Sequence, residues 1–190
     1  LVWLAPTARV RWGMLVFALT ACLLFATSAI YHRGTWSPRV ALLLRRLDHA
    51  NIFLVIAGTY TAFALTLLPT AQATGLLLIM WICAFAGVAF KVFWLSAPRW
   101  VSTPLYVLLG WVAVFYIEPL YRGGGPLVIA LIVLGGLFYT IGAVIFGVRR
   151  PNPSPRWFGF HEVFHVFTVL AFAAHALAAA ISLRAGAIPQ

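Results

Sequence analysis

The sequence predicts an all-α integral membrane protein built from long apolar helices. Of its 190 residues, 64% are hydrophobic and only 8% are charged, and the mean hydropathy is +1.01. A soluble domain carries about 25% charged residues, so this composition excludes a soluble globular protein, a disordered tail and a coiled coil. The chain also contains charge-free runs long enough for helices that cross a bilayer, which need about 20 residues each.

These runs predict six complete membrane spans in one transmembrane domain that covers residues 1–190. The first lies between Arg11 and Arg33, and the charge-free run 50–90 is divided by the turn segment 69–72. The Gly-Gly-Gly-Pro segment 123–126 separates a shorter span from the next, and a proline-rich connector, 149–155, precedes the last. The expected spans are 12–32, 49–68, 74–95, 104–121, 127–148 and 158–183.

The beginning of the chain resembles the end of an apolar segment. Residue 1 is leucine, and the apolar segment 1–6 finishes at a proline. We therefore expect a truncated helix ahead of the first complete span, which would bring the bundle to seven helices.

Basic residues between the spans predict the orientation of the chain. The formal net charge is +10, and membrane topology explains this excess better than a nucleic-acid partner does. Successive loops alternate between the two sides, so one side receives nine basic residues and the other four: Arg33, Arg39, Arg45, Arg46, Lys91, Arg99, Arg149, Arg150 and Arg156 against Arg9, Arg11, Arg122 and Arg184. We expect a multi-pass protein of the inner cell membrane. The positive-inside rule predicts that the nine-charge side is in the cytoplasm and that the C-terminus is outside.

Two cysteines, Cys22 and Cys83, lie inside apolar runs. Their number and placement exclude a disulfide scaffold. We expect both to be packed as small hydrophobic side chains.

A few ionisable residues fall within the expected spans, where such residues are costly and usually functional. His32 ends the first complete span and shares a helix face with Ser28, four residues earlier. Asp48 begins the second span, and His161 and His165, again four residues apart, begin the last. Two imidazoles at this spacing can bind one metal ion.

The predicted topology brings these residues to one level of the membrane. The span that ends at His32 runs from outside to inside, whereas the spans that begin near Asp48 and His161 run from inside to outside. At about 1.5 Å per residue, all of them lie within about one or two helical turns of the cytoplasmic side. Three histidines and one aspartate form the donor set of a zinc site, and catalytic zinc commonly keeps three protein ligands and a position for water. Asp48 could ligate the metal, hold the water or orient a histidine.

Two further histidines have other expected roles. His49 is next to Asp48 but lies about 100° around the helix, so we expect it in the headgroup region rather than on the metal. His175 is about 21 Å deeper than His161 along a helix, which is too far for the same ion. We expect His175 to hydrogen-bond between helices or to a polar group of a substrate.

The last span also contains a protease motif. Residues 161–165, His-Glu-Val-Phe-His, have the form H-E-x-x-H, in which two histidines bind zinc and the glutamate, here Glu162, is the general base. An intramembrane metalloprotease with Asp48 as a further ligand is therefore an alternative, although it leaves His32 without a role. A simpler alternative is that these polar residues lie in the headgroup region and bind no metal.

Four segments carry the residues of the expected site and their neighbours. They are Ser-Ala-Ile-Tyr-His at 28–32, Arg-Arg-Leu-Asp-His at 45–49, Ile-Ala-Gly-Thr-Tyr-Thr-Ala-Phe at 56–63 and Gly-Phe-His-Glu-Val-Phe-His at 159–165. In this order they resemble the hemolysin III family, which belongs with the progestin and adipoQ receptors, including the adiponectin receptors. The resemblance covers the chain from Trp12 onward, with one departure at Ala62, where relatives often have proline.

The resemblance implies a fold and a metal site. The family has seven transmembrane helices, a cytoplasmic N-terminus and a zinc ion near the cytoplasmic side, which implies that the first helix is truncated here. Carried over to this sequence, the zinc ligands are His32, His161 and His165, and the serine and aspartate of the pattern are Ser28 and Asp48.

The resemblance also implies an activity. The wider superfamily includes alkaline ceramidases, which implies zinc-dependent hydrolysis of a lipid amide or ester bond. Asp48 would accept a proton or orient the water, and Ser28 would support Asp48 or the developing oxyanion. Membrane lipids are the expected partners, with a substrate chain among the helices and no nucleic acid. Four arginines would either hold an anionic headgroup or act only as topology determinants: Arg45, Arg46, Arg149 and Arg150.

Two other functions stay open on this sequence. A pore-forming hemolysin, as the family name implies, needs a polar stripe along several helices, whereas the strong polar groups here cluster at one level. A receptor or sensor would use zinc structurally, and a structural site usually has four protein ligands, with Asp48 as the fourth.

Overall fold

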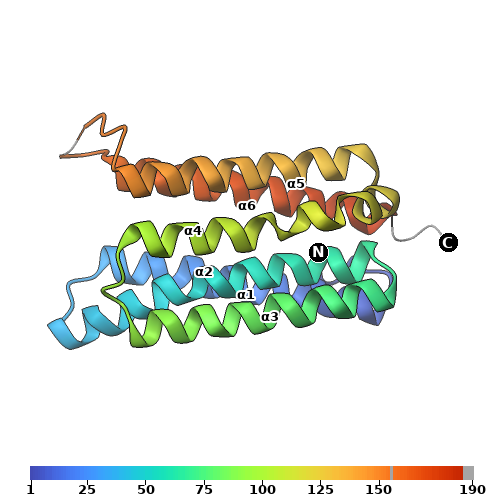
Figure 1. The fold of residues 1–190 in the computed structure, drawn as a ribbon, viewed down its shortest axis with the longest axis horizontal. Coiled ribbons are helices and arrows are strands. Elements are labelled where there is room, and N and C mark those ends of the chain that lie inside the picture. The colour runs from blue at the N-terminus through green and yellow to red at the C-terminus, as the bar shows by residue number, and fades with distance from the viewer. Residues whose placement is uncertain (155, 186–190) are drawn as a thin grey trace. The chain divides into compact units, whose positions relative to one another are not determined.

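The computed structural model describes residues 1–154 and 156–185, and within them the chain is almost entirely helical (Figure 1). The elements are α1 (Ala8–Arg33), α2 (Pro38–Leu67), α3 (Thr70–Phe93), α4 (Arg99–Gly110), the 3-10 helix η1 (Trp111–Tyr116), α5 (Ile117–Val148) and α6 (Phe160–Ala185). Across the described ranges there is no β-strand, and one isolated β-bridge joins Ser154 to Phe158. The all-α prediction is confirmed.

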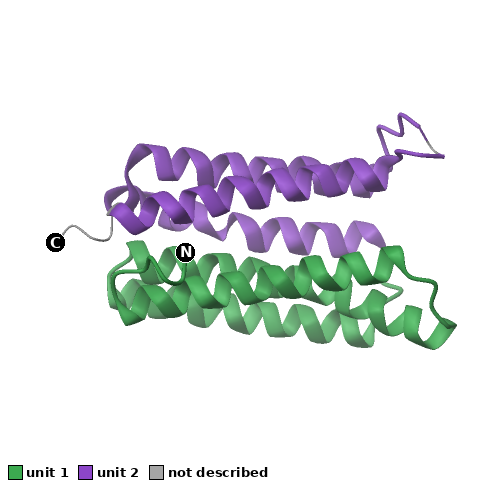
Figure 2. Cartoon of the chain, turned by 180° about the vertical axis from the view of Figure 1, so that it is seen from behind, with its two compact units in different colours: residues 1–97 green, residues 98–190 purple. Residues whose placement is uncertain are grey.

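The chain forms two compact units, Leu1–Ala97 and Pro98–Gln190 (Figure 2). In the first unit, α2 packs against both α1 and α3. In the second unit, α5 packs along α6, and α4 and η1 pack against α5. Each unit therefore builds its own helix-to-helix core, and the expectation of one transmembrane domain over residues 1–190 stays a prediction.

The number of membrane spans differs from the expected one. Among the described residues, five helices are long and apolar enough to cross a membrane: Ala8–Arg33, Pro38–Leu67, Thr70–Phe93, Arg99–Val148 and Phe160–Arg184. The prediction of six complete spans is therefore wrong. The difference arises in Arg99–Val148, a continuous stretch of 50 residues in which the expected spans 104–121 and 127–148 lie on two helices that meet at a kink at Gly125.

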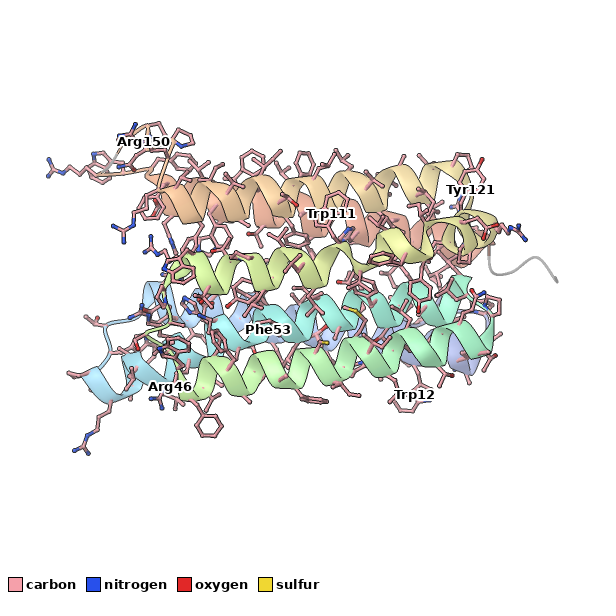
Figure 3. The ribbon with its side chains drawn as sticks, in the orientation of Figure 1. Trp12, Arg46, Phe53, Trp111, Tyr121 and Arg150 are labelled. Atoms are coloured by element: carbon pink, nitrogen blue, oxygen red, sulfur yellow. The ribbon has the colours of Figure 1, made fainter. Side chains whose placement is uncertain are left out.

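The interior of this run explains why the expected fourth span is not a helix of its own. α4 has only 12 residues, which gives about 18 Å at 1.5 Å per residue against a hydrocarbon core of about 30 Å. The chain then continues as a 3-10 helix into α5. Within η1, Trp111 Nε1 donates a hydrogen bond to Thr140 Oγ1 at 2.9 Å, which ties this segment to the middle of α5. Figure 3 shows Trp111 between the two elements.

A kink at Gly125 divides this stretch into two helices. The Gly125 backbone has φ 74° and ψ 179°, a region that only glycine adopts without strain. Pro126 follows, and a residue before proline is itself disfavoured in the helical region. The segment 123–126 therefore makes the expected break, but the break is confined to one residue, and the chain reverses direction there (Figure 1).

We expect Gly125→Ala to destabilise the protein by about 1–3 kcal/mol, because the added Cβ would strain this backbone conformation. No atom lies within 4 Å of a Cβ built at this position, so the cost comes from the backbone alone. Thermal unfolding in detergent measures it, with Gly136→Ala as the control, since Gly136 is helical and equally open. Equal unfolding midpoints for the two variants would contradict this account.

Polar side chains define the helix ends in the first unit. Thr7 Oγ1 accepts a hydrogen bond from the Val10 N–H at 3.3 Å and caps the start of α1. At the C-terminal end of α2, the Arg9 guanidinium donates to the carbonyl oxygen of Leu68 at 2.7 Å and to Thr70 Oγ1 at 3.1 Å. Because the last carbonyls of a helix lack partners and carry partial negative charge, this cation stabilises the turn between α2 and α3.

Close helix approaches hold the first unit together. A Cβ at Gly58 of α2 would overlap Thr20 Oγ1 of α1, and a Cβ at Gly13 would lie 3.1 Å from the Thr61 carbonyl oxygen. On the other face of α2, the Phe53 ring covers Gly87 of α3. Small residues at such crossings let helix backbones approach closely, as is common in membranes.

The outer faces of the helices are apolar. Trp12 is 63% exposed and points away from its unit in Figure 3. Cys22 and Cys83 are also exposed on α1 and α3. The expectation that both cysteines are packed is therefore wrong, because a membrane protein can place apolar side chains on either face of a helix and the sequence does not distinguish the two.

Candidate metal centre

Two histidines at the start of α6 form a close pair. His161 and His165 are one helical turn apart, and their Nε2 atoms lie 3.0 Å from each other. The ring centroids are 4.6 Å apart and the ring planes meet at 79°. The two imidazoles therefore aim their Nε2 atoms at one point, as the i, i+4 spacing predicted.

This geometry fits a shared metal ion. Zinc binds histidine nitrogen at about 2.0–2.1 Å in a tetrahedral arrangement, which separates two ligating nitrogens by about 3.3 Å. The pair at 3.0 Å is close to that separation. The same distance also suits an N–H···N hydrogen bond between two neutral imidazoles. The pair is therefore oriented for chelation and is held in that orientation by its own hydrogen bond.

Aromatic rings surround the pair within the second unit. The His161 ring centroid lies 6.0 Å from Phe146 of α5, 6.3 Å from Phe160 and 6.1 Å from Phe164. The Arg99 guanidinium, from α4, stacks on Phe146 at 4.7 Å and on Phe160 at 5.7 Å. An apolar shell of this kind limits water around a metal site and helps to orient its ligands.

The connector before α6 sets the position of the pair. Arg149 adopts a left-handed conformation with φ 58° and ends α5. Asn152 Oδ1 then accepts a hydrogen bond from the Phe160 N–H at 3.0 Å. The first N–H groups of a helix lack partners within it, so this bond fixes where α6 begins and, with it, where His161 lies. Pro155, part of the expected connector, lies outside the described residues.

Glu162 has a structural role at the same helix start. Its Oε2 accepts a hydrogen bond from the Gly159 N–H at 2.8 Å. An acidic side chain in the first turn of a helix is also favoured by the helix dipole. Glu162 is exposed and reaches back toward its own helix terminus, whereas a protease general base must face the metal-bound water. The motif at 161–165 therefore combines a histidine pair with a helix cap.

His175 links α6 to α5 deeper in the second unit. Its Nε2 lies 3.1 Å from the carbonyl oxygen of Ile132, so Nε2–H donates this hydrogen bond. The ring lies against Gly135, where a Cβ would overlap it, and the residue is 9% exposed. The expected interhelical hydrogen bond of His175 is confirmed.

A second group of predicted site residues lies in the first unit, where α1 ends and α2 passes. His32 Nε2 is 4.0 Å from Asp48 Oδ2, and their side chains are 36% and 13% exposed. This distance is too long for a direct hydrogen bond and leaves room for a bridging water. Ser28, half buried, lies one turn before His32 on α1. His32 and Asp48 therefore come together, with the carboxylate largely shielded from solvent.

His49 is oriented differently from His32. Its Nδ1 is 2.8 Å from the Arg45 carbonyl oxygen, so Nδ1–H donates within its own helix. The same Nδ1 is 3.8 Å from Asp48 Oδ2. This orientation favours the expected role outside the metal donor set.

One residue of this region was missed in the sequence. Asn51, 6% exposed, donates from Nδ2 to the Leu23 carbonyl oxygen at 3.2 Å and to Thr27 Oγ1 at 3.1 Å. It lies three residues after Asp48 on α2, and its partners on α1 lie nine and five residues before His32. Asn51 therefore sets the register that brings Asp48 to His32. An amide inside an apolar run, close to Asp48, was the signal that could have identified it.

Comparisons with known proteins identify the family of this chain. The family model described as "Haemolysin-III related" matches residues 1–176. The chain is 35% identical to "Hemolysin-3" of Bacillus cereus over 163 residues, which are 86% of this chain and 71% of that protein. It is 31% identical to "Hemolysin-3 homolog" of Bacillus subtilis (strain 168) over 154 residues, 81% of this chain and 69% of that protein.

No solved structure matches the chain. The family assignment therefore depends on sequence similarity. The length of the match is decisive, because the family model and both relatives align with most of the chain rather than with one motif. With several apolar helices of membrane-spanning length, the chain belongs to the hemolysin III family and is a multi-pass membrane protein.

Proposed function

We propose that this protein binds a divalent metal ion, zinc by preference, through His32, His161 and His165, and uses it to hydrolyse an amide or ester bond of a membrane lipid. Each of these histidines can offer one ring nitrogen to a metal ion. Three protein ligands are the usual number at catalytic zinc, and imidazole ligands suit zinc better than magnesium or calcium.

The observation that carries the proposal is the Nε2–Nε2 separation of 3.0 Å between His161 and His165. A helix that places two imidazoles in this geometry inside an aromatic shell supplies half of a tetrahedral site. Polar residues of this type are costly in a membrane helix unless they have a function. The proximity of His32 to a shielded carboxylate provides the second support.

The orientation of the chain is part of the proposal. Nine basic residues against four support a cytoplasmic location for the ends of the spans that carry His32, Asp48 and His161. The C-terminus then lies outside the inner membrane. The three histidines can share an ion only if they lie at the same depth in the membrane, and this orientation would place them so.

In the proposed hydrolysis, Asp48 and Ser28 would have different roles. When bound, zinc would supply Lewis acidity toward a water molecule and a carbonyl oxygen. Asp48 would accept the proton of the attacking water and return it to the departing amine or alcohol. The Ser28 hydroxyl would donate a hydrogen bond to Asp48 or to the developing oxyanion. The acyl chain lies among the apolar helices, so water reaches only the polar end of the substrate.

Two alternative functions also use a bound metal but assign different roles to Asp48 and Glu162. A receptor or sensor with structural zinc needs Asp48 as a fourth ligand, and the metal content of Asp48→Asn distinguishes this function from the proposed one. A metalloprotease needs Glu162 as general base, whereas this side chain bonds to the backbone of Gly159. This bond favours a hydrolase of the proposed type over a protease.

Membrane lysis is a second candidate, favoured by the printed names of the relatives, "Hemolysin-3" and "Hemolysin-3 homolog". Dye release from lipid vesicles measures it. Release that persists when the histidine pair is removed would favour lysis over metal-dependent hydrolysis.

We expect the purified protein to hold about one zinc ion per chain and the double variant His161→Ala/His165→Ala to hold none, because two of three ligands are lost. Elemental analysis in mild detergent measures the metal, and release of fatty acid from a short-chain ceramide and a matched ester measures the activity. The activity should disappear together with the metal.

The control is Glu162→Gln, which changes the same turn of α6 but removes no proposed ligand. It should keep both the metal and the hydrolysis. A folded wild-type protein without metal, or a double variant that retains it, would rule out the proposed site.

A further inference from the structure

The first turns of α2 extend beyond the part of this helix that is needed to cross a bilayer. The C-terminal end of α2 lies at a polar boundary, where Arg9 donates to the Leu68 carbonyl oxygen at 2.7 Å. A hydrocarbon core of about 30 Å takes up about 20 residues of helix, which leads back from Leu67 to about residue 47. However, α2 begins at Pro38, and Figure 1 shows its first turns extending past the end of α3. These turns therefore reach the headgroup region.

One face of these first turns is apolar and exposed. Val40, Leu43 and Leu47 are 39%, 56% and 42% exposed, and their i, i+3, i+7 spacing puts them on one side of the helix. Just before the helix, Trp36 is 42% exposed, and its Nε1 donates to the Ile30 carbonyl oxygen at 3.0 Å. Tryptophan is typical of the membrane–water interface. An apolar face at this level is expected to have a partner that covers it.

Two arginines lie beside the apolar face. Arg39 is exposed and Arg46 is half-buried, and their spacing of seven residues puts them on one side of the helix, about 80° around from the apolar face. Neither arginine forms an ion pair within the part of the chain that the structure describes. Asp48 is the only acidic residue among residues 1–97, and it lies about 160° around the helix from Arg46. The segment 36–47 therefore combines an apolar face with a positively charged one.

We propose that the segment 36–47 binds the surface of an anionic lipid leaflet. Val40, Leu43 and Leu47 enter the boundary between headgroups and acyl chains, as the apolar side of an interfacial helix does, and Arg39 and Arg46 bind lipid phosphates. Because the segment continues a membrane-spanning helix, the leaflet is the partner within its reach. On the proposed orientation this is the cytoplasmic leaflet. The inference depends neither on the metal nor on hydrolysis.

A spin label at Leu43 reports what surrounds the apolar face. Leu43→Cys is labelled with a nitroxide in the full chain, after the two exposed native cysteines, Cys22 and Cys83, are replaced by serine. The chain is reconstituted in phosphatidylcholine nanodiscs with increasing fractions of phosphatidylglycerol. Electron paramagnetic resonance compares collisions of the label with oxygen, which concentrates in lipid, and with a water-soluble nickel chelate. We expect the oxygen-to-nickel ratio to rise with phosphatidylglycerol, and Val40→Cys, on the same face, to give the same result.

Arg39→Gln in the labelled chain should move this rise to an about fivefold higher fraction of phosphatidylglycerol, as for the loss of one basic residue at an anionic surface. The matched control, Arg11→Gln, removes an exposed arginine near the start of α1 and should leave the curve unchanged. Equal curves for the two variants, or a label equally exposed to lipid without phosphatidylglycerol, would overturn the role of anionic lipid. A label that stays in water at every composition, or one that a protein surface shields from both reagents, would overturn the leaflet as the partner.

Discussion

Asp48→Asn is expected to lower the turnover of lipid amide or ester hydrolysis by about 100-fold or more, while the metal stays bound. A positioned general base typically contributes about 10²–10⁴-fold. Asparagine keeps the size of the side chain, but its amide cannot accept the proton that the attacking water must lose. Because Asp48 lies 4.0 Å from His32 and is 13% exposed, the substitution removes a proton acceptor and leaves the histidines in place.

Steady-state kinetics and metal analysis on the same preparation test this expectation. The fall should appear in kcat, since the proposed role of Asp48 is in the transition state rather than in binding the lipid. His49→Gln is the control, because it changes the next residue on α2, whose Nδ1 donates to the Arg45 carbonyl oxygen within the same helix. If Asp48→Asn instead loses the metal, Asp48 is a ligand, and the closed, structural type of site is correct.

Gly58→Leu is expected to destabilise the protein by about 3 kcal/mol, the upper part of the usual range for overpacking. A Cβ at Gly58 would overlap Thr20 Oγ1, and Thr20 is 6% exposed and bonded to the Val16 carbonyl oxygen at 2.9 Å. Because this hydrogen bond holds the Thr20 side chain against Gly58, α1 and α2 would have to separate to accommodate the leucine. The separation would also part His32 from Asp48.

Thermal unfolding in detergent, followed by the fluorescence of the eight tryptophans, measures the effect. Gly75→Leu is the matched control, because it makes the same change in α3, where no atom lies within 4 Å of the added Cβ. The Gly58 variant should unfold at a clearly lower temperature and lose hydrolysis, and the Gly75 variant should do neither. Equal midpoints would show that α1 and α2 are not as closely packed as this structure indicates.

Several features of the molecule could be predicted from the sequence because they depend on local chemistry. Charge-free runs of about 20 residues leave the backbone no alternative to a helix inside a bilayer. The spacing of His161 and His165 puts both imidazoles on one helix face whatever surrounds them, and the structure brings them to 3.0 Å. The high cost of ionisable groups in a membrane identified His32 and Asp48 before their proximity was known.

Helix boundaries were predicted less well where charge was used to define them. α2 begins at Pro38 rather than near residue 49, because arginines at 39, 45 and 46 are compatible with a helix that extends beyond the hydrocarbon region. Figure 3 shows Arg46 near this end of the first unit. The separation expected at 123–126 is present as a kink at Gly125, the residue of α5 that leaves the helical conformation.

What the sequence determined by itself was the class of protein, which follows from composition, and the family, which the four resembling segments identified. Spacing along one helix gave the candidate site residues. Only the tertiary structure decided which faces of different helices meet. Asn51 reaches α1, His175 reaches Ile132, and Thr20 fits against Gly58. The physical reason is that one turn of an apolar membrane helix offers nearly equivalent faces, and the choice among them depends on the shape and hydrogen bonding of the neighbouring helix.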